Sequence, residues 1–489
     1  MTAPPIALDE LLSNTRASWA EALLPEIKTS MGSSAPTITA ITQDSRTVQS
    51  GALFCALRGD AFDGHDYADA AVDAGAVAVL VERHVTNRVP ELLVADSRKA
   101  TGEIAAAFNA HPDIQLVAVT GTNGKTSVVT LVSHIVNAGG GAAASMGTLT
   151  GSLTTAAAPD FHAALRDHAQ SGRTVVAAEV SSHALDQGRI AGSVPAVSIF
   201  TNLSQDHLDY HTDMDDYFAA KAKLFGNDFV APAVVDVSDP WGQRLVEQLA
   251  SATPRTVVAV DSASYIATAR LEQTSSHFTW NGHEIDLPLG GAFSITNAVL
   301  AAEAAVLLGL APAAIAEALS QAPQIPGRFE TVDAGQPFAV VVDYSHTPAS
   351  IEAAVQSARN ISNGQVHLVF GAAGDRDAGK RPLMGAAATA ADVLYVTSDN
   401  PRTEDPELII DDVIVGVHGA GANNASVHRI ADRADAIRAA ISGALPGDIV
   451  VIAGKGHEDY QIIGSTRTDF DDRVHARAAL AAQGWEGAT

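Results

Sequence analysis

The residues best suited to chemistry form a short glycine-rich loop after an apolar run. Residues 114–120 (IQLVAVT) predict a buried strand, and a helix-compatible segment begins near Ser127. The loop between them consists of Gly121, Thr122, Asn123, Gly124, Lys125, Thr126 and Ser127. Backbone N–H groups in such a loop, backed by a helix N-terminus, bind phosphate oxygens. Lys125 would reach the outer phosphates of a nucleotide, and the Thr126 hydroxyl would bind Mg²⁺.

The loop is shorter than the usual phosphate-binding pattern G-x-x-x-x-G-K-[ST], which would need a glycine at Val119. An ordinary glycine-rich turn is therefore one alternative, and a plain kinase or nucleotide switch is another. The order of strand, Gly-Lys-Thr and helix favours phosphate binding over a simple turn.

Carboxylates and histidines gather where two further predicted strands end. Glu179 ends the apolar run 174–180, and the run 196–201 is followed by two His and two Asp within residues 206–211. Ligands bind at the carboxyl ends of parallel strands in open α/β sheets, and Glu179 could hold a hard cation there. Taken alone, residues 206–211 are equally compatible with a solvated polar loop.

The elements that must position these groups alternate regularly along the chain. Short apolar runs recur between alanine-rich stretches, and the further runs are 233–237, 256–260, 338–343, 366–370, 392–397 and 448–453. This pattern predicts parallel sheets covered on both faces, and so an α/β protein. The long apolar stretch 295–319 contains Asn297 and Glu303, which predicts a buried helix and not a membrane span. The short run 139–144 (GGGAAA) is expected to be a loop.

Two boundaries divide the chain into segments of ordinary domain size. The first follows His111-Pro112-Asp113, just before a buried strand, and the second lies within residues 325–328. We therefore expect domains at 1–113, 114–326 and 327–489. A chain of 489 residues agrees with three domains of roughly 150 residues each.

The composition excludes several functional classes. The chain is 47% hydrophobic and 18% charged, which excludes a mostly disordered protein. Asp and Glu outnumber Lys and Arg by 56 to 30, and this surface charge argues against nucleic acid as a partner. Cys55 is the single cysteine, so an internal disulfide is impossible. The N-terminal residues do not have the pattern of a secretory signal, and we expect a cytoplasmic protein without membrane insertion.

Nine motifs, taken together and in order, resemble the ATP-dependent Mur ligase family of peptidoglycan synthesis. They occupy residues 120–127, 179–185, 201–211, 217–225, 327–330, 342–348, 374–384, 399–402 and 453–461. Residues 44–67 also resemble the uridine-nucleotide domain of this family, so the resemblance covers nearly the whole chain. The motif DNPR (399–402) and the sequence GKGHE (454–458) resemble the branch that adds meso-2,6-diaminopimelate.

The resemblance implies a fold and a reaction. The fold would be a central P-loop parallel-sheet ATPase domain between an N-terminal UDP-substrate domain and a C-terminal Rossmann-like domain that binds the amino acid. The substrates would be ATP, meso-diaminopimelate and UDP-N-acetylmuramoyl-L-alanyl-D-glutamate (UDP-MurNAc-L-Ala-D-Glu). The reaction would be amide formation at the D-Glu γ-carboxyl through an acyl phosphate. We expect a monomer.

The resemblance also implies roles for individual residues. The catalytic residues would be Lys125, His207 and Lys221, the last of them as a carbamate that binds Mg²⁺ together with Thr126, Glu179 and His207. Residues 121–127 would hold ATP together with Asn297, Arg328, Asp343 and Tyr344. The contacts to the UDP-substrate would be Ser45, Gly64, His65, Thr154, Thr155, Ser182 and Arg189. The amino-acid pocket would comprise Arg376, Asp399, Asn400, Pro401, Arg402, Gly454 and Glu458.

The amino-acid pocket is also chemically sensible for diaminopimelate. Arg376 and Arg402 offer fork-shaped donors for carboxylates, and Glu458 offers an acceptor for an ammonium group. Lysine has no second carboxylate, so it would leave an arginine unpaired, which is costly in a buried site.

The sequence departs from the family pattern at three places, and the sequence alone leaves rival functions open. Ser294 stands where Asn is frequent, Ser345 stands where Ala is common, and no proline follows Thr155 directly. The rival functions are a lysine-adding ligase, a folylpolyglutamate synthetase and a non-catalytic nucleotide-binding protein. The acceptor of the amine proton is also open, with His207 and Asp343 as candidates.

Overall fold

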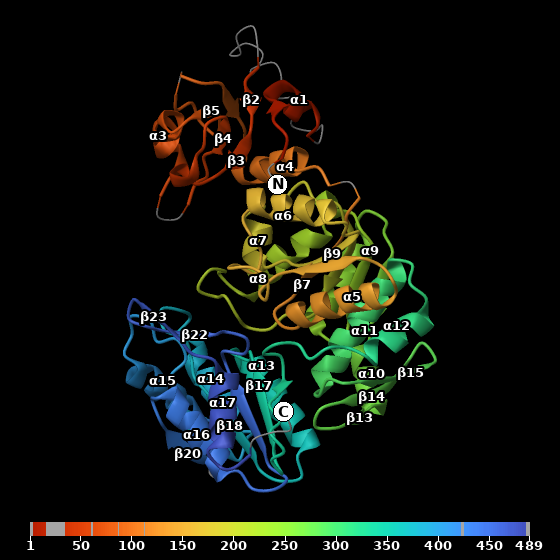
Figure 1. The fold of residues 1–489 in the computed structure, drawn as a ribbon, viewed down its shortest axis with the longest axis vertical. Coiled ribbons are helices and arrows are strands. Elements are labelled where there is room, and N and C mark those ends of the chain that lie inside the picture. The colour runs from red at the N-terminus through yellow and green to blue at the C-terminus, as the bar shows by residue number, and fades with distance from the viewer. Residues whose placement is uncertain are drawn as a thin grey trace.

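Three sheets, one in each third of the chain, organise the computed structural model. It describes residues 3–15, 35–59, 62–86, 88–111, 113–421 and 425–485, so Pro112 at the first expected boundary lies outside it. We call residues 3–111 the first part, 113–326 the middle part and 327–485 the last part. Figure 1 shows the first part at one end, in red and orange, and the last part at the other, in blue.

The first part is a four-stranded parallel sheet with helices packed on it. The strand order is β3-β4-β5-β6, with bounds β3 (Ala40–Thr42), β4 (Ala52–Cys55), β5 (Ala76–Val81) and β6 (Glu91–Leu93). The short strands β1 (Ile6–Ala7) and β2 (Thr37–Ile38) pair antiparallel beside it. Its helices are α1 (Leu8–Ser13), α3 (Ala68–Asp73) and α4 (Ser97–Phe108). Helix α4 packs on the middle part, where a Cβ at Gly102 would lie 2.7 Å from the Ala191 Cβ.

The middle part carries a six-stranded parallel sheet in the order β12-β11-β10-β7-β9-β8. The bounds are β7 (Gln115–Thr120), β8 (Ala143–Met146), β9 (Val175–Glu179), β10 (Pro195–Phe200), β11 (Ala233–Asp236) and β12 (Val257–Val260). Alternate residues of β7 enter different cores, since Val117 and Val119 belong to one cluster and Leu116 and Ala118 to another. The sheet is therefore buried on both faces, which is why its strands read as continuous apolar runs.

Helices cover both faces of the middle sheet. They are α5 (Lys125–Ala138), α6 (Ala158–Gln170), α7 (Ser182–Asp186), α8 (Met214–Ala222), α9 (Pro240–Ala250), α10 (Ser262–Thr268), α11 (Ala292–Leu307) and α12 (Pro312–Leu319). A small antiparallel sheet adds β13 (Arg270–Leu271), β14 (Ser276–Trp280) and β15 (His283–Leu287).

Two local predictions for the middle part need correction. Residues 139–144 are not all loop, because Ala143 and Ala144 begin β8 and pair with Val175 and Val176 of β9. The stretch 295–319 is not one helix but parts of two, because Gly309 adopts a φ of 92° between α11 and α12. Within the described part of the chain, no helix combines the length and apolar character that crossing a bilayer requires.

The last part has a second six-stranded sheet, ordered β16-β17-β21-β18-β19-β20. The bounds are β16 (Glu330–Thr331), β17 (Ala339–Asp343), β18 (Val366–Phe370), β19 (Val393–Val396), β20 (Ser426–Arg429) and β21 (Ile449–Ala453). All neighbours are parallel except β16, which pairs antiparallel with β17. The helices are α13 (Pro348–Ile361), α14 (Lys380–Ala388), α15 (Pro406–Gly419), α16 (Arg433–Gly443) and α17 (Asp472–Ala481). A hairpin of β22 (Tyr460–Ile463) and β23 (Thr466–Asp469) projects from it.

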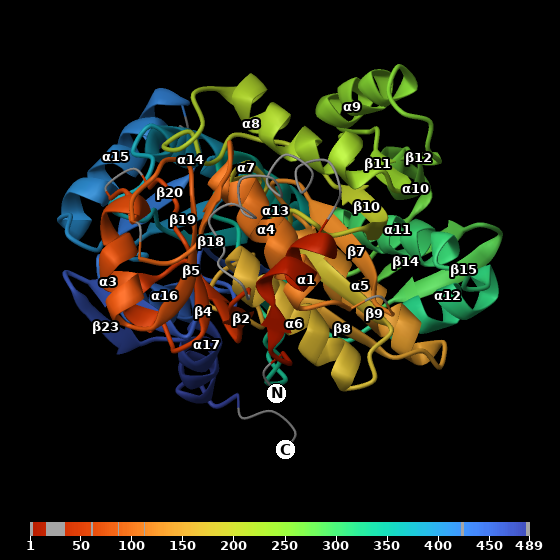
Figure 2. The ribbon, with the colours of Figure 1, turned by 90° about the horizontal axis from the view of Figure 1, so that it is seen from above.

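The predicted α/β architecture is confirmed in all three parts. Seen from above, the first part lies in front, with the last part on one side and the green elements α9 to α12 on the other (Figure 2). The loops after β9 and β10 and the loops after β17, β18, β19 and β21 contribute residues to one cleft. The cleft is thus built from the carboxyl ends of strands in two sheets, the usual place for ligands in such folds.

Candidate active site

The loop between β7 and α5 turns on two glycines with positive φ. Gly121 has φ 149° and Gly124 has φ 86°, and Gly124 caps the N-terminus of α5. A Cβ at Gly124 would collide with the Asn297 side chain of α11, and one at Gly121 would collide with Thr201. Because α5 begins at Lys125, the unpaired N–H groups of its first turn face the loop, as a phosphate site requires.

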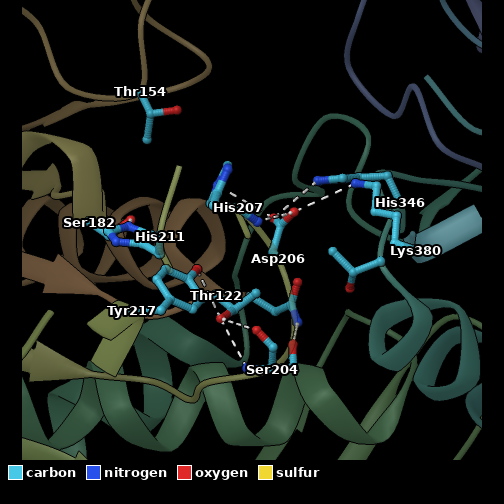
Figure 3. Close-up of polar contacts among 12 residues, drawn as sticks. Thr122, Thr154, Ser182, Ser204, Asp206, His207, His211, Tyr217, His346 and Lys380 are labelled. Carbon is cyan, nitrogen blue, oxygen red and sulfur yellow. Dashed lines mark hydrogen bonds and ion pairs between the residues drawn. The ribbon is translucent and has the colours of Figure 1, made fainter. Parts of the chain in front are cut away.

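The segment after β10 holds this loop in place. Thr122 N–H donates to the Asn202 carbonyl at 2.9 Å, and Asn123 N–H donates to the Asn202 side chain at 3.0 Å. The Thr122 hydroxyl lies 3.2 Å from the Tyr217 hydroxyl and accepts from Ser204 N–H at 3.1 Å (Figure 3). Two segments about 80 residues apart in the chain are therefore one structural unit.

Two lysines converge on the same backbone carbonyl of the loop. Lys125 Nζ donates to the carbonyls of Gly121 at 3.0 Å and Thr122 at 2.8 Å, and Lys221 Nζ donates to Gly121 at 2.8 Å. Lys221 is buried and lies over the Tyr217 ring. Burial lowers the pKa of Lys125, and burial together with the charge of Lys125 lowers the pKa of Lys221 well below its usual range. The site therefore favours an uncharged Lys221 amine.

Glu179 and Thr126 lie together as predicted, at the mouth of the loop. The buried Glu179 carboxylate accepts from the Thr126 hydroxyl at 3.0 Å and from Thr148 N–H at 2.9 Å. Gly147 lets the two segments approach, because a Cβ there would collide with the Glu179 carboxylate. This pair of oxygen donors beside a phosphate loop fits a hard cation.

His207 lies farther out, in the open cleft. It has φ 57°, its side chain is 44% exposed, and its ring meets the His183 ring edge-on at 4.9 Å. The surrounding walls of the cleft shield the ring from bulk water, and this desolvation lowers the pKa of His207 to about 3, although the nearby Asp206 carboxylate opposes the shift. The neutral imidazole is the form that can ligate a metal. Across the described ranges, no three His, Cys, Asp or Glu side chains gather closely enough to form a metal cluster.

Asp206 joins the middle part to the last part across the cleft. Its carboxylate lies 3.6 Å from Lys380 Nζ, 3.7 Å from His346 Nε2 and 3.4 Å from His207 Nε2 (Figure 3). Burial raises the pKa of Asp206, but the neighbouring His346, His207 and Lys380 outweigh burial and lower this pKa well below its usual value. Sequence reasoning missed Lys380 and His346, although both lie inside motifs of the resemblance, 374–384 and 342–348.

The three predicted nucleotide contacts of the last part differ in what they bind. Arg328 Nη2 donates to the Thr126 hydroxyl at 2.7 Å, and its guanidinium lies 4.4 Å from the centre of the Tyr344 ring. Asp343 accepts instead from the backbone N–H groups of Phe329, at 2.8 Å, and Ser345, at 2.9 Å. Asp343 therefore shapes the turn that carries Arg328 and Tyr344.

The cleft itself has a volume of about 740 Å³. Its walls include Thr154, His183 and His207 from the middle part and Arg376, Arg402 and Glu458 from the last part.

Backbone strain concentrates around this cleft. Of the five described non-glycine residues with positive φ, four lie in its loops or beside them, namely His207, Phe329, Asp375 and Arg402. Such conformations persist only where surrounding contacts hold them, and they are frequent in the loops of active sites.

The predicted amino-acid pocket is a connected network around Asn400. The Asn400 amide donates to Glu458 at 3.0 Å, and its oxygen accepts from Lys455 Nζ at 3.1 Å and from Ile462 N–H at 2.9 Å. Lys455 is fully buried and also faces Asp399, at 3.9 Å. Burial, and then the charge of Asp399, raise the pKa of Glu458. Sequence reasoning did not assign Lys455 to this pocket, although it lies within GKGHE.

Of the other members of the predicted pocket, some line the cleft with their side chains and others determine the backbone conformation of its loops. Arg402 lines the cleft, and its buried Nε has no hydrogen-bond partner in the described part of the chain. The exposed Arg376 lines the cleft as well. Gly454 has φ 116°, and a Cβ there would lie 2.6 Å from an Asp399 carboxylate oxygen. Pro401 is buried beside Arg402.

The predicted contacts to the UDP-substrate fall into two groups. In the middle part, Thr155 donates to the Glu179 carbonyl at 2.9 Å, Arg189 donates to the Thr155 carbonyl at 2.7 Å, and Ser182 bonds to His211 at 2.9 Å. Thr154 lines the cleft beside them.

The second group, Ser45, Gly64 and His65, lies in the first part and does not line this cleft. His65 is buried, and its two ring nitrogens bond to Asp63 at 2.6 Å and to Glu82 N–H at 2.8 Å. Its ring nitrogens are therefore already occupied. A Cβ at Gly64 would lie 2.7 Å from Leu57 backbone atoms, so this glycine serves close backbone packing.

Comparison with known proteins identifies the family. Residues 37–109 match the family described as Mur ligase family, catalytic domain, residues 119–305 match the Mur ligase middle domain, and residues 327–456 match the Mur ligase glutamate ligase domain. The UDP-N-acetylmuramoyl-L-alanyl-D-glutamate–2,6-diaminopimelate ligase of Geobacillus thermodenitrificans is 42% identical over 470 residues, 91% of this chain and 95% of that protein. The chain belongs to the Mur ligase family. A Synechococcus sp. (strain WH7803) protein of the same name is also 42% identical, over 483 residues, 91% of this chain and 95% of that protein.

Solved structures of Mur ligases share the fold over the whole chain. A structure titled as UDP-N-acetylmuramoyl-L-alanyl-D-glutamate–2,6-diaminopimelate ligase is 32% identical with a TM-score of 0.67, and covers 99% of this chain and 100% of its own. MurF from Acinetobacter baumannii, at 20% identity, has a TM-score of 0.64 and covers 99% of both chains. The predicted membership of the Mur ligase family is thereby confirmed.

Proposed function

We propose that this Mur ligase joins meso-2,6-diaminopimelate to the D-Glu γ-carboxyl of UDP-MurNAc-L-Ala-D-Glu, using ATP and an acyl phosphate. One observation carries the proposal. The cleft that Arg402 and Glu458 line is also lined by Tyr344, and Arg328, which lies over the Tyr344 ring, bonds to Thr126 of the phosphate loop. Relatives that are 42% identical and carry the name of this activity support it.

The phosphate loop supplies positive charge for the phosphoryl transfer. We propose that the α5 N-terminus and residues 121–127 bind the ATP phosphates, with Lys125 and Arg328 beside the transferring group and Asn297 and Tyr344 on the nucleoside side. Preorganised cations of this kind stabilise the charge that spreads over the phosphoryl oxygens. The D-Glu carboxylate attacks the γ-phosphorus, so that an acyl phosphate forms and ADP leaves.

Thr126, Glu179 and His207 are the residues that we propose to hold Mg²⁺, together with a carbamate on Lys221. The 3.0 Å contact between Thr126 and Glu179 supports the choice of the first two. When bound, Mg²⁺ would supply further positive charge next to the transferring phosphoryl group. Lys221 suits carbamate formation, because an uncharged amine is the form that attacks CO₂, and the product is an anionic oxygen ligand.

The last part supplies the groups that would recognise diaminopimelate. We propose that Arg376 and Arg402 pair with its carboxylates and that Glu458 accepts from an ammonium group. Asp399, Asn400, Pro401 and Gly454 shape the pocket, with Asn400 holding Glu458 in place. The substrate amine then attacks the acyl phosphate, an amide forms and phosphate leaves.

The remaining assignments are parts of the same proposal. The UDP-muramoyl substrate would extend from Thr154, Thr155, Ser182 and Arg189 toward Ser45, Gly64 and His65 in the first part. The domain division at 113/114 and 326/327 is proposed because each segment has its own sheet. A monomer in the cytoplasm is also proposed, and the walls of the cleft come from two parts of a single chain.

Phosphate release from the purified protein tests the function. The assay contains ATP, Mg²⁺, bicarbonate and UDP-MurNAc-L-Ala-D-Glu, with meso-diaminopimelate, L-lysine or no amino acid. We expect release with diaminopimelate and little with lysine or without an amino acid. Equal release with lysine would contradict the specificity, and no release with either amino acid would contradict the ligase itself.

A further inference from the structure

A fully buried ion pair lies beneath the two loops that form the amino-acid side of the cleft. Arg433 is the first residue of α16, and Asp472 is the first residue of α17. Their side chains are 0% exposed, and the guanidinium Nε and Nη2 donate to the two carboxylate oxygens at 2.7 Å each. This is the bidentate geometry in which arginine pairs most strongly with a carboxylate.

The same guanidinium also reaches both pocket loops. Arg433 Nη2 donates to the Ala453 carbonyl at 2.9 Å, and Nη1 donates to the Ser398 carbonyl at 3.4 Å. Ala453 directly precedes Gly454, and Ser398 directly precedes Asp399. The two loops follow β21 and β19, and β18 lies between these strands in the sheet. One side chain thus spans the end of β18 and joins two loops that no backbone ladder connects.

Charge balance explains why the two residues occur together. A guanidinium without access to water is costly unless its donors are paired and its charge is compensated. Asp472 compensates the charge, and the two carbonyls take up further donors. A pair that served only to attach α16 to α17 would have no need of the Ser398 and Ala453 carbonyls.

We propose that Arg433, held by Asp472, is a positioning residue that sets the spacing of the loops at 399–402 and 454–458. Through these loops it determines how well Arg402 and Glu458 meet the two ends of diaminopimelate. This inference rests on the proposed function and adds to it a determinant of amino-acid affinity beneath the pocket.

Steady-state kinetics of a charge-free double variant tests the positioning role. Arg433→Met with Asp472→Leu removes the ion pair without leaving a lone buried charge, and such replacements often keep stability. Because small displacements of binding groups weaken substrate positioning, we expect the KM for meso-diaminopimelate to rise by about tenfold or more, with the KM for ATP nearly unchanged. Arg433→Lys keeps the charge but has a single nitrogen, so we expect an intermediate rise.

The matched control lies at the other end of β19. Arg359 pairs with Asp392 at 2.6 Å, just before this strand begins and away from the cleft. We expect Arg359→Met to leave both KM values unchanged, whatever its effect on thermal unfolding.

The outcomes separate this inference from the proposed function. If the folded double variant kept the wild-type KM for diaminopimelate, or if both KM values rose together, the positioning role would be wrong. If the double variant did not fold, Arg433→Lys would be judged by the same two criteria. Wild-type protein without diaminopimelate-dependent release would contradict the proposed function, whereas active wild type with unaltered variants contradicts the positioning role alone.

Discussion

Several buried ionisable side chains lie at the candidate site. Lys221, Lys455 and Glu179 are almost inaccessible to solvent, yet each lies beside the phosphate loop or the amino-acid pocket. A buried ionisable group is costly unless it has polar partners, so such a residue indicates that its surroundings form a binding site.

Replacement of Lys221 tests the proposed carbamate. We expect Lys221→Ala to lower turnover by about a hundredfold, because a ligand next to the metal is lost. Added formate or acetate should restore part of the activity by supplying the missing anionic oxygen. The control is Lys223→Ala, since Lys223 lies on the same segment but forms an exposed pair with Asp186 at 2.6 Å. Full activity of Lys221→Ala would contradict the carbamate.

Replacement of Arg402 tests the discrimination between amino acids. We expect Arg402→Met to lower the preference for diaminopimelate over lysine by about a hundredfold, because the second carboxylate loses its partner. The ratio of kcat/KM for the two amino acids measures this preference. Arg467→Met is the control, since Arg467 lines the same cleft but is 65% exposed and already stacked on Tyr460. A preference unchanged in Arg402→Met would mean that another residue reads the carboxylate.

At the scale of elements, the proposed phosphate loop is fixed on three sides. The end of β7, the start of α5 and the segment after β10 all hold it, and Gly124 leaves room for Asn297 of α11. An alanine at position 124 should therefore disturb the loop in two ways, through the strain of its positive φ and through the collision of its Cβ with Asn297.

Alanine substitutions at two glycines with nearly the same φ distinguish the effect of backbone strain from the effect of a side-chain collision. Gly124 and Gly140 have φ 86° and 83°, but a Cβ at Gly140 meets nothing within 4 Å, whereas one at Gly124 collides with Asn297. Each substitution should cost about 1 kcal/mol in free energy of unfolding from the left-handed backbone. We expect only Gly124→Ala to raise the KM for ATP, by about tenfold or more, because it displaces the loop. A KM for ATP unchanged in Gly124→Ala would show that the loop tolerates this displacement.

Strands could be predicted from the sequence where burial on both sheet faces makes them continuous apolar runs. The runs at 114–120 and 448–453 are buried on both faces and could be read directly as β7 and β21. Strand β8 was missed because its Ala143–Met146 segment follows glycines and has no β-branched residue, and its pairing with β9 is a tertiary effect. The Asp206–Lys380 contact could not be predicted, since it depends on how two sheets face each other.

At the scale of the whole molecule, the candidate site extends across the contact between the middle and last parts. Arg328 reaches Thr126, and Lys380 and His346 reach Asp206, so the five side chains of this contact zone come from parts of the chain with two different sheets. Because Asp206 and Lys380 are both nearly buried, salt should screen this pair only weakly.

Removal of Lys380 tests whether this contact governs closure of the cleft. We expect Lys380→Met to lower kcat by about tenfold while the KM for ATP changes little, because the last part is held less closely over the loop. Small-angle scattering with bound nucleotide should then report a larger radius of gyration than for wild type. The control is Lys99→Met, which removes the exposed pair of Lys99 with Asp228 between the first and middle parts. Wild-type kcat and scattering in Lys380→Met would contradict this role.

The bond between Arg328 and Thr126 also has a consequence for how the protein is made. The two residues are separated by 202 positions in the chain. At about 5–20 residues per second, a ribosome would need about 10–40 s to reach the arginine after it has made the threonine. Throughout that interval the nascent phosphate loop has neither Arg328 nor any residue of the amino-acid pocket. On the proposed function, we therefore expect the unfinished chain to be poorly equipped to hydrolyse ATP during that interval.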